Sequence, residues 1–182
     1  LWLIAAFSVG YPPIDLAAAS APNLPVPNTP DVLSDATADL YFLLLLGACR
    51  RAAEYGRIMQ EGWRRTFGLS DLLGTQVAGK TLGILGMGRI GQAVARRARG
   101  FDMQIIYSDQ HQLSSDLAAG ATFYPDYRQM LPHCDILSLH VPASPDGKPC
   151  MDREAFNLLP RGAVFINAAR GKLVDEEALL DA

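Results

Sequence analysis

A glycine-rich segment carries the clearest chemistry in this sequence of 182 residues. Residues 86–91 read Gly-Met-Gly-Arg-Ile-Gly and match the pattern G-x-G-x-x-G, between an apolar run typical of a strand and a stretch with helical periodicity. In that setting Gly86 permits a tight turn, Gly88 lets a phosphate group approach the backbone, and Gly91 lets the helix pack on the strand. The unpaired N–H groups at the start of the helix attract phosphate. The segment therefore predicts a Rossmann-type site for a dinucleotide.

Asp109 is the second residue expected at this site. It follows the next predicted strand and lies 18 residues after Gly91, close to the spacing of about 20 that is usual for a ribose-binding carboxylate. Without the glycine segment, Asp109 would be read as an ordinary turn residue at a strand end. A carboxylate there accepts the ribose hydroxyls and repels a 2′-phosphate, and neither Gln110 nor His111 supplies a guanidinium to offset it. The sequence favours NAD over NADP.

The elements that must position these residues alternate between strands and helices. We expect strands at 81–85, 103–107, 121–124, 136–141 and 163–167, and helices at 89–99 and 153–159. Near-continuous apolar strands of this kind predict an α/β fold, a doubly wound parallel sheet covered on both faces.

The first half of the chain is less regular. Leu1–Ile4 predicts a buried strand, Asp15–Ser20 a short helix, and Ala21–Pro30, with four prolines, a connection between domains. Ser34 is a candidate N-cap for a long helix running to about Gly56, whose apolar middle suggests burial between two layers. Residues 62–79 have the glycines and polar residues of a loop.

Composition excludes several classes of function. A net charge of −3 gives no basic surface for nucleic acid or an anionic membrane. The longest apolar run, Leu40–Cys49, is too short to span a bilayer, and the N-terminus lacks the pattern of a secretory signal, so we expect a cytoplasmic protein.

The three cysteines and three histidines lie in no metal-binding or redox spacing, so we expect reduced thiols and no metal site. His140 lies in an apolar strand, where packing or a local hydrogen bond is a more common role than catalysis. The sequence begins with Leu and stops within a helical pattern, so we expect it to be an internal piece of a longer protein.

Five ordered segments give the chain a resemblance to a known family. They are Phe7-Ser8-Val9-Gly10-Tyr11 with Ile14-Asp15, Asn28-Thr29-Pro30-Asp31-Val32-Leu33-Ser34 with Ala38-Asp39, Gly83 to Gly91, Leu137-Ser138-Leu139-His140-Val141-Pro142, and Asn167-Ala168-Ala169-Arg170-Gly171 with Val174-Asp175-Glu176. In these segments the chain resembles the D-isomer-specific 2-hydroxyacid dehydrogenases, above all their glyoxylate/hydroxypyruvate reductase branch.

The resemblance implies two domains and a set of contacts. Residues 1–28 would be the end of a flavodoxin-like substrate domain and residues 29–182 a truncated NAD-binding Rossmann domain. The amides of Val9 and Gly10 would face the substrate carboxylate, and Ser34 would lie near the nicotinamide. The remaining cofactor contacts would be Gly86, Gly88, Arg89, Ile90, Gly91, Asp109, Val141, Pro142, Ala168 and Ala169. The region from Ser34 through the 62–79 loop would form a two-fold homodimer.

Arg170 would be the substrate arginine. A planar, permanently charged guanidinium can hold the carboxylate and carbonyl oxygen of a 2-keto acid together and polarise the carbonyl for hydride attack. The family's catalytic glutamate and histidine lie downstream of this segment, so no residue in 1–182 is assigned those roles. Pro12-Pro13 replaces the polar pair usual in the substrate loop.

These observations predict an NAD-dependent oxidoreductase acting on a small 2-keto or 2-hydroxy acid, with glyoxylate and hydroxypyruvate as the leading substrates. A non-enzymatic NAD sensor or corepressor on the same fold is the alternative from another class, since a fold does not fix a function. A histidine with a partnering glutamate beyond residue 182 would distinguish the enzyme from the sensor. An enzyme acting on formate or phosphite is a third hypothesis. It is weakened because the segment 31–39 resembles that of the reductases.

Overall fold

The computed structural model describes residues 1–6, 14–29, 31–64, 66–144 and 146–182. Its strands are β1 (Thr81–Leu85), β2 (Gln104–Ser108), β3 (Thr122–Phe123), β4 (Ile136–Leu139) and β5 (Val164–Asn167). Its α-helices are α1 (Leu16–Ser20), α2 (Ser34–Cys49), α3 (Ala52–Gln60), α4 (Arg89–Ala98), α5 (Ser115–Ala118), α6 (Tyr127–Met130), α7 (Arg153–Leu158) and α8 (Glu176–Asp181). Three short 3₁₀ helices are η1 (Arg99–Phe101), η2 (Leu131–His133) and η3 (Gly171–Leu173).

The five strands form one parallel sheet in the order β3-β2-β1-β4-β5. The chain leaves β1 toward one edge and returns through β4 toward the other, so the topology switches between β1 and β4, the place where open α/β sheets bind ligands. The five expected strands are confirmed to within two residues at each end, and the Rossmann-type fold class is confirmed.

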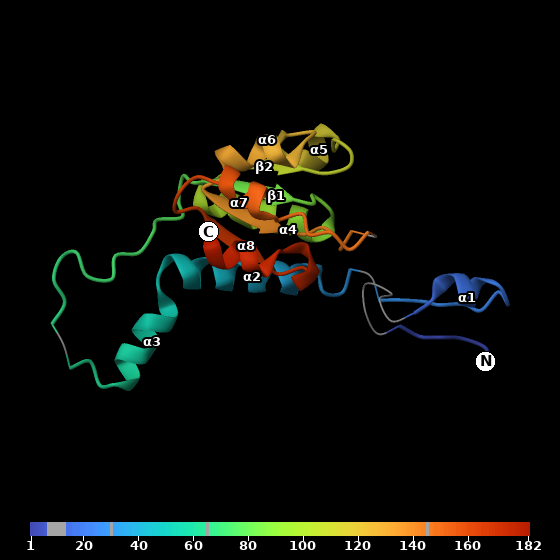
Figure 1. Cartoon of the computed structure of the whole chain (residues 1–182), viewed down its shortest axis with the longest axis horizontal. Helices are drawn as coiled ribbons and strands as arrows, with labels where there is room; N and C mark the ends of the chain where they lie inside the picture. The colour runs from blue at the N-terminus through green and yellow to red at the C-terminus, as the bar shows by residue number, and fades with distance from the viewer. Residues whose placement is uncertain (7–13, 30, 65, 145) are drawn as a thin grey trace.

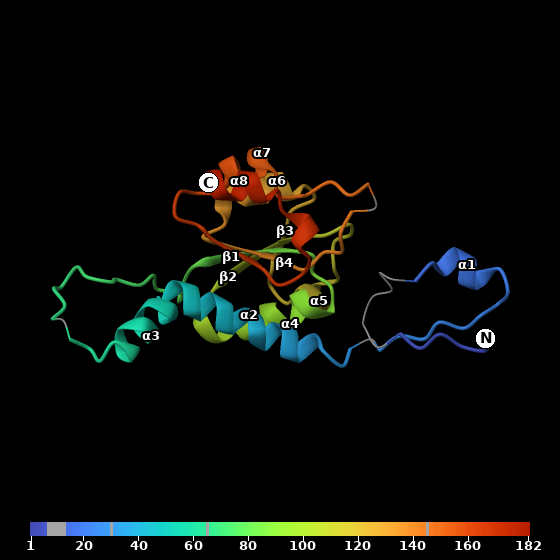
Figure 2. The same ribbon diagram turned by 60° about the horizontal axis from the view of Figure 1, so that its bottom comes forward.

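Alternation along the strands produces two cores, one on each face. On β1 the side chains of Leu82 and Ile84 enter the core under α2 and α4, and Leu85 enters the core under α6, α7 and α8. Figure 2 shows α2 and α4 on one side of the sheet and α6, α7 and α8 on the other. The prediction of a parallel sheet covered on both faces is confirmed.

The long helix predicted from Ser34 to about Gly56 is wrong in two respects. It is interrupted at Arg51, which has a left-handed backbone (φ 55°), and the chain continues as α3. The Cys49 carbonyl accepts a hydrogen bond of 2.8 Å from the N–H of Thr75, so the returning loop takes an acceptor that a continuous helix would need. The cap is also wrong, because Leu33 holds the N-cap position and Ser34 is the first helical residue.

The prediction that α2 is buried between two layers is also wrong. Tyr41 and Leu45 are completely buried against the sheet, but Leu40, Leu43 and Leu44 on the outer side are 48%, 68% and 42% exposed. The apolar middle therefore combines a core-facing side with an uncovered apolar side.

The buried strand predicted at Leu1–Ile4 is not formed. Leu1 and Trp2 are 93% and 94% exposed, and among the described residues this extended segment pairs with a second one, through bonds from Ile4 N–H to the Pro25 carbonyl and from Ala6 N–H to the Pro27 carbonyl. Two extended segments alone cannot bury a face. Helix α1 forms as expected, with the Asp15 side chain accepting from the N–H of Ala18, and Figure 1 shows it away from the sheet.

Among the described residues, no helix is long and apolar enough to cross a membrane. The cytoplasmic location stays a prediction.

Candidate functional site: the carboxyl edge of the sheet

Strand register brings the sequence-predicted residues to one edge of the sheet. Ser108 pairs with Leu85, Leu85 with Leu139, and Leu139 with Asn167, so four parallel strands end in one row. The next residues along the chain are Asp109, Gly86, His140 and Ala168. The residues chosen for the cofactor and for the substrate therefore emerge side by side at the carboxyl edge.

The glycine turn has the geometry that a dinucleotide requires. Gly86 has φ +96°, and a Cβ there would lie 2.8 Å from the His140 carbonyl and from a Val141 methyl group. A Cβ on Gly91 would lie 2.3 Å from the Gly86 carbonyl oxygen, so the start of α4 packs directly on the turn. Larger side chains at Gly86 and Gly91 would push the turn and the helix apart.

Gly88 differs, because its surroundings are open. Nothing in the described structure lies within 4 Å of the position where a Cβ would stand, and no side chain caps α4, whose N-cap is Gly88. The first N–H groups of this ten-residue helix thus have no side-chain cap, and they can bind a pyrophosphate with the aid of the helix dipole. The residues present fit a dinucleotide.

The Asp109 carboxylate lies against this turn. Its Oδ2 accepts a hydrogen bond of 2.7 Å from the N–H of Met87, and its Oδ1 accepts one of 2.7 Å from the N–H of Gln110. Each oxygen keeps a further lone pair with which to accept a hydroxyl.

Arg89 and Ile90, in the first turn of α4, lie at the surface and against the core, respectively. Arg89 is exposed and its Nε lies 2.6 Å from Asp31 Oδ1, whereas Ile90 packs against the core under α2 and α4. The Arg89–Asp31 ion pair connects the cofactor loop to the entrance of α2, where Ser34 donates its N–H to the Asp31 carbonyl.

His140 is a half-buried residue of this edge. Its Nε2 lies 2.7 Å from the Ser138 hydroxyl oxygen, and its ring packs edge-on against Tyr41 with ring centroids 5.9 Å apart. Burial lowers the pKa of His140 to about 4, so the ring is neutral near pH 7. The local hydrogen bond that the sequence suggested for His140 is present.

Arg170 follows β5 at the exposed end of the row. Its Nη1 donates a hydrogen bond of 2.9 Å to the Ala169 carbonyl, and η3 begins at the next residue. Val141, Ala168 and Ala169 are half-buried and Pro142 is exposed, so they surround the open edge between β4 and β5. Val9, Gly10 and the Pro12-Pro13 pair lie outside the described residues.

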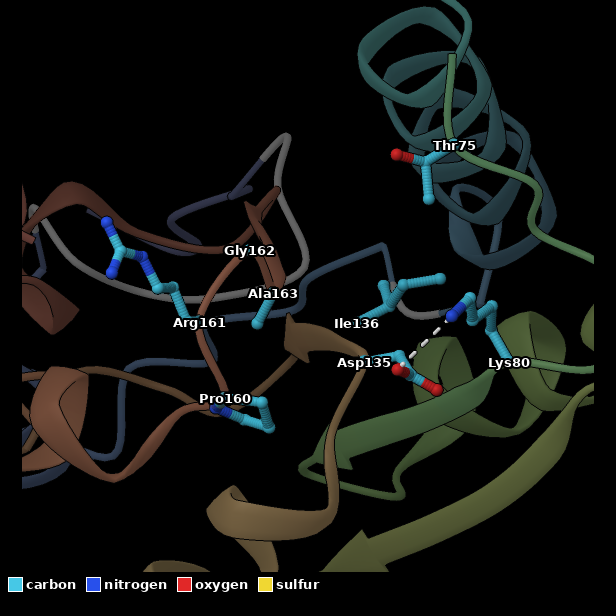
Figure 3. Close-up of a pocket in the computed structure, with 8 residues that line it drawn as sticks. All are labelled: Thr75, Lys80, Asp135, Ile136, Pro160, Arg161, Gly162 and Ala163. Carbon is cyan, nitrogen blue, oxygen red and sulfur yellow. Dashed lines mark hydrogen bonds and ion pairs between the residues drawn. The ribbon is translucent and has the colours of Figure 1, made fainter. Parts of the chain in front are cut away.

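A hollow of about 130 Å³ lies at the opposite edge, where β1, β4 and β5 begin (Figure 3). Asp135 serves the fold there, since Oδ2 accepts from the N–H of Thr81 at 2.9 Å and Oδ1 lies 3.5 Å from Lys80 Nζ. The guanidinium of Arg161 points away from this pair in Figure 3. The charged pair in this hollow thus serves the fold, and the carboxyl edge, where the predicted residues meet, is the candidate site.

Comparison with known families agrees with this geometry. Residues 42–182, more than half of the chain, match the family described as D-isomer specific 2-hydroxyacid dehydrogenase, NAD binding domain. The chain belongs to this family. Its cofactor is NAD, as the sequence predicted.

Similar proteins include a glyoxylate reductase of Korarchaeum cryptofilum, 40% identical over all of this chain and 55% of its own length. A glycerate dehydrogenase of Hyphomicrobium methylovorum is 40% identical over 98% of this chain and 56% of its own length. A solved structure from Polaromonas sp. JS6 66, titled a putative D-isomer specific 2-hydroxyacid dehydrogenase, NAD-binding, has 43% identity and a TM-score of 0.93 over all of this chain and 57% of its own. The chain thus spans about half the length of these relatives.

Two contacts of this dehydrogenase domain were not predicted from the sequence. The Met87 N–H bond to Asp109 joins residues that follow different strands, and the Arg89–Asp31 pair joins the first residue of α4 to the segment before α2. The bonds from the Asn167 side chain to the Ala169 N–H and the Arg170 carbonyl were not predicted either, although an asparagine at a strand end before a short loop is a known signal for a turn closed by a side chain.

Proposed function

We propose that this chain is the cofactor-binding part of an oxidoreductase that transfers a hydride between NAD(H) and a small 2-hydroxy or 2-keto acid. The observation that carries the proposal is the row of strand ends, where the glycine turn, Asp109 and Arg170 follow β1, β2 and β5 of one sheet. Glyoxylate or hydroxypyruvate is the proposed substrate. Relatives named as reductases and dehydrogenases favour the enzyme over the NAD sensor.

The cofactor half of the mechanism follows from the backbone. The N–H groups at the start of α4 bind the pyrophosphate, and the Asp109 carboxylate accepts the ribose hydroxyls. Val141, Pro142, Ala168 and Ala169, which follow β4 and β5, would hold the nicotinamide end. The bound nicotinamide supplies or accepts the hydride.

The substrate half depends on Arg170. Its guanidinium, held at the Ala169 carbonyl through Nη1, would use its remaining N–H groups to bind the carboxylate and the carbonyl oxygen of the keto acid, which orients the carbonyl carbon and stabilises the negative charge that develops on oxygen. His140 is not the proton donor in this proposal, because its ring is engaged with Ser138 and packed against Tyr41 and loses its proton well below neutral pH.

Steady-state assays of the full-length protein with NADH and each of glyoxylate, hydroxypyruvate and pyruvate test the proposal. We expect reduction of glyoxylate or hydroxypyruvate, and no turnover by residues 1–182 alone, because no proton donor is assigned within them. Absence of keto-acid reduction by the full-length protein would refute the proposal. Turnover by residues 1–182 would place the acid/base among His111, His133 and His140.

We also propose a two-fold homodimer formed through α2 and the segment 62–79. The uncovered side of α2 exposes Leu40, Leu43 and Leu44, and the segment that follows α3 exposes Trp63, Leu69 and Leu73 at 51%, 101% and 66%. Large exposed apolar side chains on one region mark an association surface, and two-fold symmetry is the commonest way to close one. Sedimentation of the full-length protein at micromolar concentration should give a dimer, and a monomer would refute the proposal.

A further inference from the structure

The Asn167 side chain closes the loop that presents Arg170. Asn167 is the last residue of β5, and its Nδ2 donates a hydrogen bond of 2.8 Å to the Arg170 carbonyl while its Oδ1 accepts one of 3.0 Å from the N–H of Ala169. We propose that Asn167 is a positioning residue that sets the direction of the Arg170 guanidinium toward a keto-acid substrate. This inference rests on the proposed function.

The hydrogen bonds form a chain from the sheet to the guanidinium. Asn167 is anchored in the sheet, where it pairs with Leu139. It fixes the peptide N–H of Ala169, whose carbonyl in turn accepts the hydrogen bond from Arg170 Nη1. The Arg170 carbonyl is held twice, by Asn167 Nδ2 and by the N–H of Leu173 at 3.2 Å. An exposed arginine otherwise loses considerable rotamer freedom on binding a ligand, and the Nη1 bond to the Ala169 carbonyl restricts that freedom in advance.

The amide group is suited to this task because it donates and accepts at once. An aspartate could accept from Ala169 but could not donate to the Arg170 carbonyl. It would also place a negative charge beside the guanidinium and compete with the substrate carboxylate. A neutral amide leaves the charge of Arg170 for the substrate.

Kinetics of the full-length protein test the positioning role. Asn167→Ala should lower kcat/KM for the keto acid about tenfold, chiefly through a higher KM, with the Kd of NADH unchanged within about twofold. Asn167→Asp should lower kcat/KM for the keto acid by as much. Asn157→Ala, an exposed asparagine on α7, is the matched control and should behave as the unsubstituted protein.

A double-mutant cycle separates positioning through Arg170 from a general structural effect. If Asn167 acts through the guanidinium, Asn167→Ala should cost less than about threefold when Arg170 is already lysine. A further tenfold loss in that background would overturn the proposal, since the two side chains would then act independently.

Hydrogen exchange supplies a readout that needs no activity. Peptides covering 168–174 should exchange faster in Asn167→Ala than in Asn157→Ala, because the Ala169 N–H loses its acceptor. Unchanged exchange would refute the loop closure. Faster exchange with unchanged kcat/KM would refute the positioning role and leave the proposed function intact. Failure of the unsubstituted protein to reduce any keto acid would remove the proposed function and the positioning role with it, while the exchange rates would still decide whether Asn167 closes the loop.

Discussion

The carboxylate of Asp109 accepts a hydrogen bond of 2.7 Å from the backbone N–H of Met87, the residue between the first two glycines of the cofactor turn. The two residues lie at the ends of β2 and β1, which the parallel register brings together. Asp109 therefore has two tasks. It is placed to accept the ribose hydroxyls, and it holds the turn that binds the pyrophosphate.

Asp109→Ser in the full-length protein should narrow the preference for NADH over NADPH by about 1 to 3 kcal/mol, because the carboxylate that repels a 2′-phosphate is removed. The affinity for NADH should also fall, because the Met87 N–H loses its charged acceptor. Fluorescence titration with both cofactors measures the change, and Asp116→Ser on α5 removes the same charge outside the site. Equal affinities of the unsubstituted protein for NADPH and NADH would contradict the assignment.

Arg170→Lys should reduce kcat/KM for the keto acid by at least about tenfold, or roughly 1.4 kcal/mol, because an ammonium cannot make the two parallel hydrogen bonds of a guanidinium. NADH binding should stay nearly unchanged. Lys172→Arg, an exposed change in η3, is the control. A change in NADH affinity as large as the kinetic loss would mean that Arg170 serves the cofactor instead.

His140 should make stability depend on pH. Its pKa is about 4 in the folded chain against 6.5 for a free histidine, so between these values the unfolded chain binds the extra proton. The resulting stabilisation is complete above about pH 6.5 and is lost as the pH falls toward 4, with about 2 kcal/mol gone by pH 4.5. Chemical denaturation at pH 7 and pH 4.5 should show a smaller loss for His140→Gln than for the parent. The exposed His111→Gln should keep the parent's loss, and an equal loss in His140→Gln would rule out His140 as the cause.

Gly83 should not tolerate a side chain. A Cβ there would lie 2.2 Å from the Cys134 sulfur, so Gly83→Ala should cost about 1 to 3 kcal/mol of unfolding free energy through overpacking. Removal of the sulfur by Cys134→Ala should compensate, making the double variant more stable than the sum of the two single changes predicts. Gly100→Ala is the control, because nothing in the described structure lies within 4 Å of its Cβ position. If the two changes in unfolding free energy, measured with urea, simply add, the contact with the Cys134 sulfur is not what excludes a side chain at Gly83.

Leu43→Glu should convert the proposed dimer to a monomer in sedimentation experiments. Leu43 is 68% exposed, so the charge disturbs the outer side of α2 while Tyr41 and Leu45 stay buried beneath it. Leu117→Glu, at a residue 54% exposed on α5, should leave the dimer intact. A dimer that persists in Leu43→Glu would place the interface elsewhere.

The sequence by itself determined the sheet and the glycine turn, because both depend on local patterns. Apolar runs of strand length predict buried parallel strands, and Gly86 marks a position in the cofactor turn that needs a positive φ. Asp109 could be selected from the same pattern, because its distance along the chain from the glycines is fixed by one helix and one strand. The family resemblance added Arg170 at the end of β5.

The tertiary structure decided what lies beside what. Nothing local in the sequence indicates that Thr75 takes the Cys49 carbonyl and ends α2, or that one side of an apolar helix stays uncovered. The bonds from Met87 to Asp109 and from Arg89 to Asp31 likewise join residues distant along the chain. Such contacts depend on strand register and helix packing, which the fold sets by burying the largest apolar area as a whole, so they appear only when the complete arrangement is known.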